Sequence, residues 1–115
     1  MNDYLDNVRG KLGGAVEALA SGTGPLKQRL YDCYRDIGVL DPGQLADEYE
    51  GLAQDLEGLK NAFTWLPPSD KRPDLGTLYG TLNALDEDEA QTLARRVVSL
   101  HEDVCRELYT SEVSG

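Results

Sequence analysis

Residues 41–66 read DPGQLADEYEGLAQDLEGLKNAFTWL and predict the element around which the fold is built. Asp41 suits a helix N-cap, Pro42 suits the first helical turn, and Pro67 directly after the stretch ends the pattern. Apolar side chains recur in steps of four and three, which places them on one stripe of an α-helix. They are Leu45, Tyr49, Leu52, Leu56, Leu59, Phe63 and Leu66. We therefore expect a long helix over about residues 42–65.

The opposite side of this expected helix is acidic, because no Lys or Arg occurs between Asp36 and Leu59. Carboxylates on successive helical turns recur at about 5 to 6 Å, close to the phosphate spacing along one nucleic-acid strand. The carboxylates on this side are Asp47, Glu48, Glu50, Asp55 and Glu57. The stretch thus predicts one face for the core and one strongly negative face.

The rest of the chain is also typical of helices, since Val, Ile and Thr never form the alternating runs that strands require. Leu and Val at helical spacing predict a first helix over about residues 3–20, and SGTGP at 21–25 separates it from a second. PPSDKRP at 67–73 is the clearest loop, and a short fourth helix is expected after it.

The last helix is expected over about residues 87–109. Asp86, with Glu89 three residues later, matches a capping box, and Glu87 and Asp88 add favourable negative charge to the first turn. Two adjacent apolar rows on this helix predict contact with two neighbouring helices.

A chain of 115 residues has the usual size of one domain. We predict a single all-α domain over residues 1–115, a compact antiparallel bundle of about five helices, with 111–115 as a frayed tail. Gly10, Gly13 and Gly14 are unusual inside a helix, where each costs about 1 kcal/mol relative to Ala. A kink, a close approach by another backbone and an exposed, frayed helix remain alternatives.

The charge balance restricts the partners. Eleven Lys and Arg against 21 Asp and Glu give a formal net charge of -10 at pH 7. This excess argues against direct binding to nucleic acid, which needs a basic surface, and against docking on anionic membranes. It favours electrostatic steering toward a basic protein. The alternative is that the acidic charge only keeps the protein soluble.

The sequence predicts a cytoplasmic protein with reduced thiols. MNDYLDNVRGKLGG at the N-terminus lacks a signal-peptide pattern, and no stretch approaches the roughly 18 apolar residues of a membrane span. Cys33 and Cys105 are too few for a disulfide framework.

Residues that could carry catalysis are sparse. His101 and Cys105 share a helical face, but zinc needs three or four protein ligands and Cys33 lies on another helix. Both cysteines fall on apolar faces, which raises the pKa of a thiol. Magnesium would need carboxylates that converge from two helices. We therefore expect no catalytic site, no metal site and no cofactor.

Two features remain that a binding protein would use: the acidic side and Trp65. Trp65 lies at the expected rim of the bundle beside a loop, where a Trp serves either as a binding anchor or as a cap on the core. The predicted partner-binding residues are Asp47, Glu48, Glu50, Asp55, Glu57, Trp65, Asp86, Glu87, Asp88 and Glu89.

In size, charge and helicity the chain resembles the small acidic proteins with which phages and mobile elements block basic host machinery. CRISPR inhibitors and other nucleic-acid mimics are examples. The leading hypothesis is a non-catalytic, acidic inhibitor of a basic, nucleic-acid-handling protein or complex. A homo-oligomeric structural or adaptor bundle is the second, because the Leu stripe could form half of a homodimer seam. A magnesium-dependent all-α nucleotide hydrolase is the third.

Overall fold

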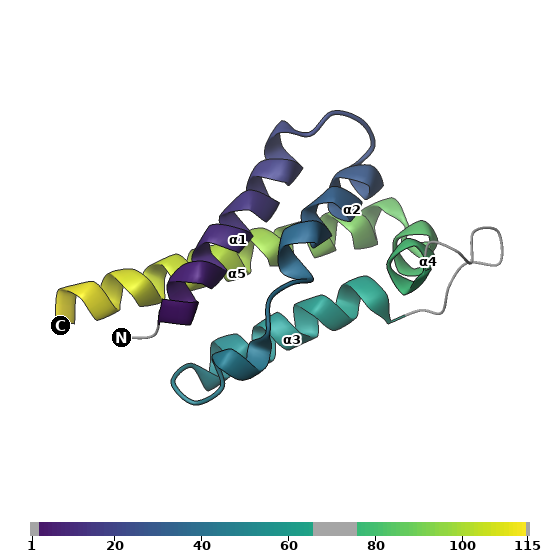
Figure 1. Ribbon diagram of the computed structural model, residues 1–115. Helices are drawn as coiled ribbons and strands as arrows, with labels where there is room; N and C mark the ends of the chain where they lie inside the picture. The colour runs from purple at the N-terminus through teal and green to yellow at the C-terminus, as the bar shows by residue number, and fades with distance from the viewer. Residues whose placement is uncertain (1–2, 66–75, 115) are drawn as a thin grey trace.

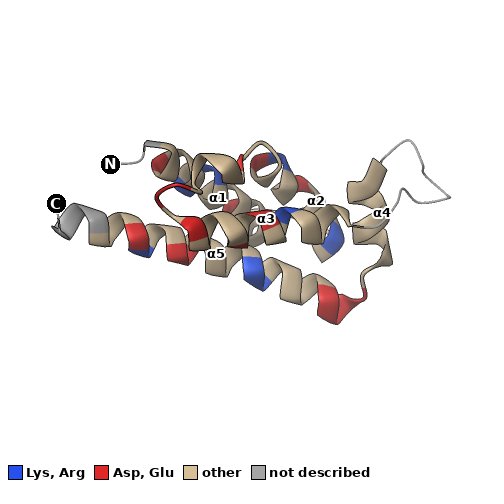
Figure 2. Ribbon diagram, turned by 90° about the horizontal axis from the view of Figure 1, so that it is seen from below, with Lys and Arg blue, Asp and Glu red and all other residues tan. Residues whose placement is uncertain are grey.

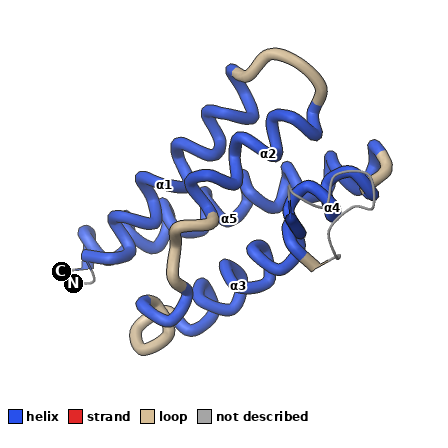
Figure 3. The backbone as a smooth tube through the Cα atoms, turned by 45° about the vertical axis from the view of Figure 1, so that its right-hand side comes forward, coloured by secondary structure: helices blue, strands red, loops and turns tan. Residues whose placement is uncertain are grey.

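The structure, a computed structural model, describes residues 3–65 and 76–114. Within these ranges the chain forms five α-helices and one short 3₁₀ helix, and no strand. In chain order they are α1 (Asp3–Ser21), α2 (Leu26–Ile37), η1 (Pro42–Gln44), α3 (Glu50–Thr64), α4 (Gly76–Ala84) and α5 (Glu87–Ser114) (Figure 1). Figure 3 shows short loops between α1 and α2 and between α4 and α5. The prediction of an all-α bundle is confirmed.

Helix α5 is the central element, because it contacts α1, α2 and α3. Helices α1 and α2 form an antiparallel hairpin that crosses α5, while α3 runs beside α5 in the opposite direction (Figure 1). Helix α4 contacts α2 and α3. The prediction that the last helix packs against two neighbours is confirmed, and the bundle is elongated, with extents of 52 × 27 × 20 Å.

The core is built from the helical stripes that the sequence predicts. Leu56, Leu59 and Phe63 of α3 are at most 1% exposed, and the Phe63 ring lies 5.0 Å from that of Tyr34 between centroids. Burying each side chain of this size contributes about 1.5–3 kcal/mol. These three members of the α3 stripe are therefore covered within one chain, while Tyr49 and Leu52 are half-buried. Leu66, the last member of the predicted stripe, lies outside the described residues.

The predicted helix over residues 42–65 is wrong in its first part. Asp41 does act as a cap, since its Oδ1 accepts from the Gly43 N–H at 3.0 Å, but it caps only the 3₁₀ helix η1. The chain then turns, and α3 begins at Glu50. The turn lets Leu40 and Leu45 both enter the core at 1% exposure.

The apolar spacing continues across this break, which is why it suggested one helix. The Tyr49 N–H donates to the Leu45 carbonyl oxygen at 2.7 Å, and this single α-turn preserves the four-residue step. A tertiary contact holds the turn in place, because the Asp41 N–H donates to the Tyr4 hydroxyl of α1 at 2.6 Å.

The glycines of α1 divide into two kinds. A Cβ at Gly14 would lie 2.7 Å from Asp36 Oδ2 on α2, and one at Gly13 would lie 3.5 Å from His101 Nε2 on α5. Gly10 has nothing within 4 Å. The atoms near Gly14 and Gly13 belong to side chains, so the close approach that the structure shows is by the Asp36 carboxylate at Gly14 and not by another backbone.

Helix α5 begins as predicted and ends later. The Glu89 N–H donates to Asp86 Oδ1 at 2.7 Å, and the Asp86 N–H donates to Glu89 Oε1 at 3.0 Å, which confirms the capping box. The helix continues to Ser114 instead of ending near residue 109, so most of the expected tail is helical. Among the described helices, none combines the length and apolarity needed to cross a membrane.

Candidate partner-binding surface

All ten residues that the sequence proposes for partner binding are exposed. Trp65, at the C-terminal end of α3, is 64% exposed. A ring that open does not cap the core, so the alternative of a core-capping Trp does not fit the structure.

Helices α3 and α5 bring carboxylates together at one end of the molecule. A cavity of about 430 Å³ lies between the start of α3 and the C-terminal half of α5. Tyr49 and Leu52 line it as half-buried apolar groups. Its carboxylates are Glu48, Glu50, Asp55, Asp103 and Glu107.

Two further cavities continue this hollow along the same pair of helices. One of about 220 Å³ shares Asp55 and Asp103 with the first and also contacts Arg96. The next, of about 340 Å³, shares Arg96 and is lined by Trp65. It also contacts the residues at the start of α5, namely Asp86, Asp88 and Glu89.

We call this continuous surface between α3 and α5 the acidic seam. Its carboxylates are Glu48, Glu50, Asp55, Asp86, Asp88, Glu89, Asp103 and Glu107. Figure 2 shows the acidic positions around the start of α3 beside those of α5, and a second group at the start of α5. From Asp86 to Glu107 the seam follows α5 for about 30 Å, at 1.5 Å per residue.

The seam differs from the predicted acidic ridge in its members. The predicted set omits Asp103 and Glu107, which lie outside both the carboxylate run at residues 47–57 and the capping-box turn at residues 86–89. Their four-residue spacing places them in one acidic row on that helix, and this is the signal by which the sequence could identify them. They join the site only because α3 lies against α5.

Some predicted residues do not join the seam. Glu57 lies on another side of α3, in a cavity that it shares with Pro42 and Gly43 of η1. Asp47 and Glu48 belong to the turn before α3, so the regular helical spacing expected from Asp47 to Glu57 does not hold. Asp47 and Glu87 are exposed but line none of the three cavities.

Few cations neutralise these carboxylates. Among the side chains of residues 4–65 and 76–110 only two ion pairs occur, Arg9 with Asp6 at 2.7 Å and Arg106 with Asp103 at 3.1 Å. Other basic side chains hold backbone carbonyls instead: Arg29 donates to Leu19 at 2.8 Å, Lys60 donates to Leu40 at 2.6 Å, and Lys27 donates to Asn83 at 3.1 Å. Two arginines, Arg96 and Arg106, line the seam, so its eight carboxylates outnumber its cations.

Two seam carboxylates also have a structural role. Asp86 and Glu89 form the capping box of α5, so each uses an oxygen to hold the backbone. Asp55 and Asp88 form no side-chain hydrogen bond or ion pair among the described residues, and both remain available to a partner.

The His101 and cysteine positions show no assembled reactive centre. Cys105 Sγ lies 3.6 Å from His101 Nε2, and Cys33 lies on α2 in the core. Burial, with a smaller effect of the nearby Asp36 carboxylate, raises the pKa of the Cys33 thiol to about 12. This confirms the predicted direction for Cys33. The described residues contain no group of three or more His, Cys, Asp or Glu that could hold a metal ion.

Comparison of the chain with protein-family models, with curated proteins and with solved structures finds no match.

Proposed function

We propose that this protein is a non-catalytic binding module whose acidic seam occupies the basic, nucleic-acid-binding surface of another protein. Its role would be that of an inhibitor, of the kind that phages and mobile elements direct against host defence, CRISPR inhibitors included. The single observation that carries the proposal is the seam itself, in which exposed carboxylates from two packed helices form one continuous surface.

The dimensions of the seam support this proposal. Its length of about 30 Å is close to one turn of duplex DNA, roughly 34–36 Å. A groove that accepts a duplex is lined with Lys and Arg that neutralise successive phosphates. The seam carries carboxylates at both ends of that length and Asp55 between them, with Arg96 as a cation in its middle.

The two ends of the seam offer apolar contacts as well. Trp65 is exposed at one end, and Tyr49 lines the cavity at the other. Aromatic side chains dominate the binding energy of many interfaces, whereas charges mainly set the rate of association and the choice of partner. The combination suits a partner that is basic and also has an apolar pocket.

The test is a competition with nucleic acid. The full chain is immobilised, a nuclease-treated bacterial lysate is applied, and the column is washed and then eluted with excess duplex DNA. We expect a basic nucleic-acid-binding protein to be released by DNA at constant salt. A captured protein that DNA does not displace, or a column that retains nothing, would contradict the proposal.

A further inference from the structure

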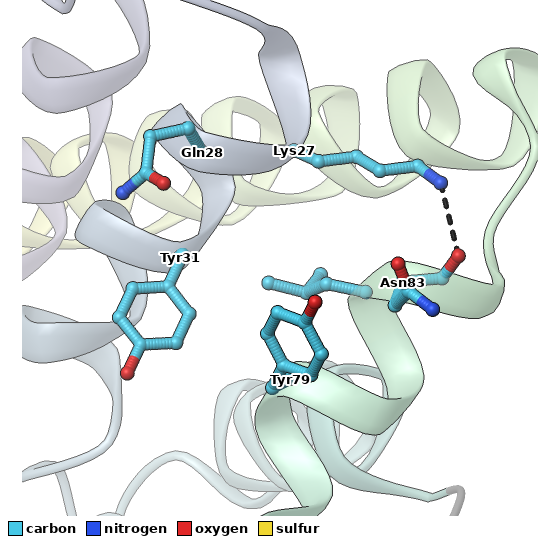
Figure 4. A pocket seen from close by; sticks show the side chains of 6 residues that line it. Lys27, Gln28, Tyr31, Tyr79 and Asn83 are labelled. Carbon is cyan, nitrogen blue, oxygen red and sulfur yellow. Dashed lines mark hydrogen bonds between the residues drawn. The ribbon is translucent and has the colours of Figure 1, made fainter. Parts of the chain in front are cut away.

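A second cavity is separate from the acidic seam and has a different chemistry. It lies between α2 and α4, measures about 330 Å³, and shares no lining residue with the seam. Its lining residues are Lys27, Gln28 and Tyr31 from α2 and Tyr79, Leu82 and Asn83 from α4 (Figure 4). Cavities of about 300 Å³ and above are of the size that holds small organic ligands.

The apolar part of this cavity is aromatic. Leu82 is 3% exposed and forms the buried part of the wall, while Tyr31 and Tyr79 are half-buried and come from the two facing helices. In Figure 4 the Tyr79 hydroxyl points toward Lys27, whereas the Tyr31 hydroxyl points away from it. A flat ring would find apolar and aromatic contacts on these three side chains.

The polar part of the cavity is cationic. The Lys27 ammonium crosses from α2 to α4 and donates to the Asn83 carbonyl oxygen at 3.1 Å. An ammonium has three N–H donors, so two remain after this bond. The Gln28 amide donates one of its two N–H groups to Asp32 at 3.2 Å. The donors that line the cavity therefore include its second N–H as well as Lys27, the Asn83 amide and the Tyr79 hydroxyl.

Charge distinguishes this cavity from the rest of the molecule. No carboxylate is among the described residues that line it, although the chain as a whole carries a formal charge of -10. Asp32 accepts a hydrogen bond from the lining residue Gln28, so one carboxylate lies at the edge of the cavity, whereas Lys27 lies in its lining. The single ammonium of Lys27 suits a ligand that carries one negative charge.

We propose that the cavity between α2 and α4 binds a small aromatic carboxylate. The ring packs against Tyr31, Tyr79 and Leu82, and the carboxylate accepts hydrogen bonds from the Lys27 ammonium and the Asn83 amide. This site goes beyond the partner-binding function and does not depend on it.

The test is an NMR titration of the isotope-labelled full chain with three probes. Benzoate has the ring and the charge, benzamide has the ring without the charge, and acetate has the charge without the ring. We expect saturable shifts for benzoate at the amides of Lys27, Tyr31, Tyr79 and Asn83. Benzoate should bind about tenfold more tightly than either other probe, because a charge-assisted bond is added to ring contacts.

Substitutions at Lys27 separate the contribution of its charge to benzoate affinity from that of its aliphatic stem. Lys27→Met keeps the stem and should lower benzoate affinity about tenfold, to that of benzamide, whereas Lys27→Arg should retain most of it. Lys11→Met, on the exposed side of α1, removes the same charge elsewhere and should change nothing. An unchanged helical circular dichroism spectrum shows that each variant folds.

Three results would overturn the proposal: equal affinity for benzoate and benzamide, shifts that map away from α2 and α4, or shifts that do not saturate. Should Lys27→Met fail to fold, Tyr79→Leu provides the second variant, with loss of benzoate affinity expected and unchanged affinity contradicting the site. None of these results bears on the acidic seam, whose residues are all different.

Discussion

At the scale of single residues, the glycines of α1 show that the effect of a glycine on helix stability depends on what packs against it. Gly14 lies so close to Asp36 that a Cβ would force the carboxylate to move, whereas the space beside Gly10 is open. The sequence could not distinguish them, since both lie in the same helix. Only the packing of α2 leaves no room for a side chain at Gly14.

This difference predicts that the same substitution stabilises the protein more at Gly10 than at Gly14. Gly10→Ala should raise the free energy of unfolding by about 0.5–1 kcal/mol, because Ala restricts the unfolded chain and favours the helix. Gly14→Ala should gain less or lose stability, since its methyl group displaces Asp36. Urea denaturation measures both. Combining Gly14→Ala with Asp36→Ala should recover the gain, and equal effects of the two single variants would show that the contact has no energetic role.

Cys33 gives a second prediction at this scale. Its pKa of about 12, raised from 9.0 by burial and by Asp36, means that the folded state holds the neutral thiol. The buried neutral thiol contributes fully to the free energy of unfolding below pH 9. This contribution is lost as the pH rises toward 12, because the thiol ionises in the unfolded state first. Cys33 should therefore resist thiol reagents at pH 8 until the protein unfolds.

The measurement is the rate of labelling by a disulfide reagent with and without urea, with Cys105→Ser used to isolate Cys33. Rapid labelling of Cys33 in the native protein would contradict its place in the core. The half-buried Cys105, followed in the Cys33→Ala variant, is expected to react first.

At the scale of elements, patterns within one helical turn were predictable and those that depend on tertiary packing were not. The Asp86 and Glu89 capping box was found from two residues at the correct spacing, because its hydrogen bonds are local. The start of α3 was missed by several residues, because the turn at Leu45 continues the apolar spacing and is held by contacts with α1 and the core.

The capping box predicts that Asp86, which holds the helix start, matters more for stability than the exposed Asp88. Asp86→Ala should lower the free energy of unfolding by about 1 kcal/mol, because the Glu89 N–H loses its acceptor. Asp88→Ala, two residues later and exposed, should cost only a few tenths through the helix dipole. Thermal or urea denaturation of both variants measures the difference. If the two substitutions were equally costly, the cap would not hold the start of α5.

At the scale of the whole molecule, the site is a product of the fold. The sequence identified the acidic character of the chain and several members of the surface, Glu48 and Asp55 among them. It could not supply Asp103 and Glu107, nor exclude Glu57, because membership depends on which side of α3 meets α5. Trp65 joins the start of α5 for the same reason.

Binding that depends only on the net charge would respond to substitutions differently from binding at the acidic seam. If the formal charge of -10 only attracted basic proteins nonspecifically, every exposed carboxylate would contribute about equally. If the seam is the binding surface, position matters and total charge matters less. Two sets of substitutions with equal loss of charge distinguish these cases.

The most direct measurement compares these two triple variants for retention of the DNA-displaced partner, as a function of salt. The seam variant combines Glu48→Gln, Asp55→Asn and Glu107→Gln; the control combines Glu17→Gln, Glu57→Gln and Glu102→Gln, all at exposed positions. We expect the seam variant to lose the partner at a salt concentration where the control and the original chain still hold it. Equal loss in both variants, or retention by both, would contradict the acidic seam as the binding surface.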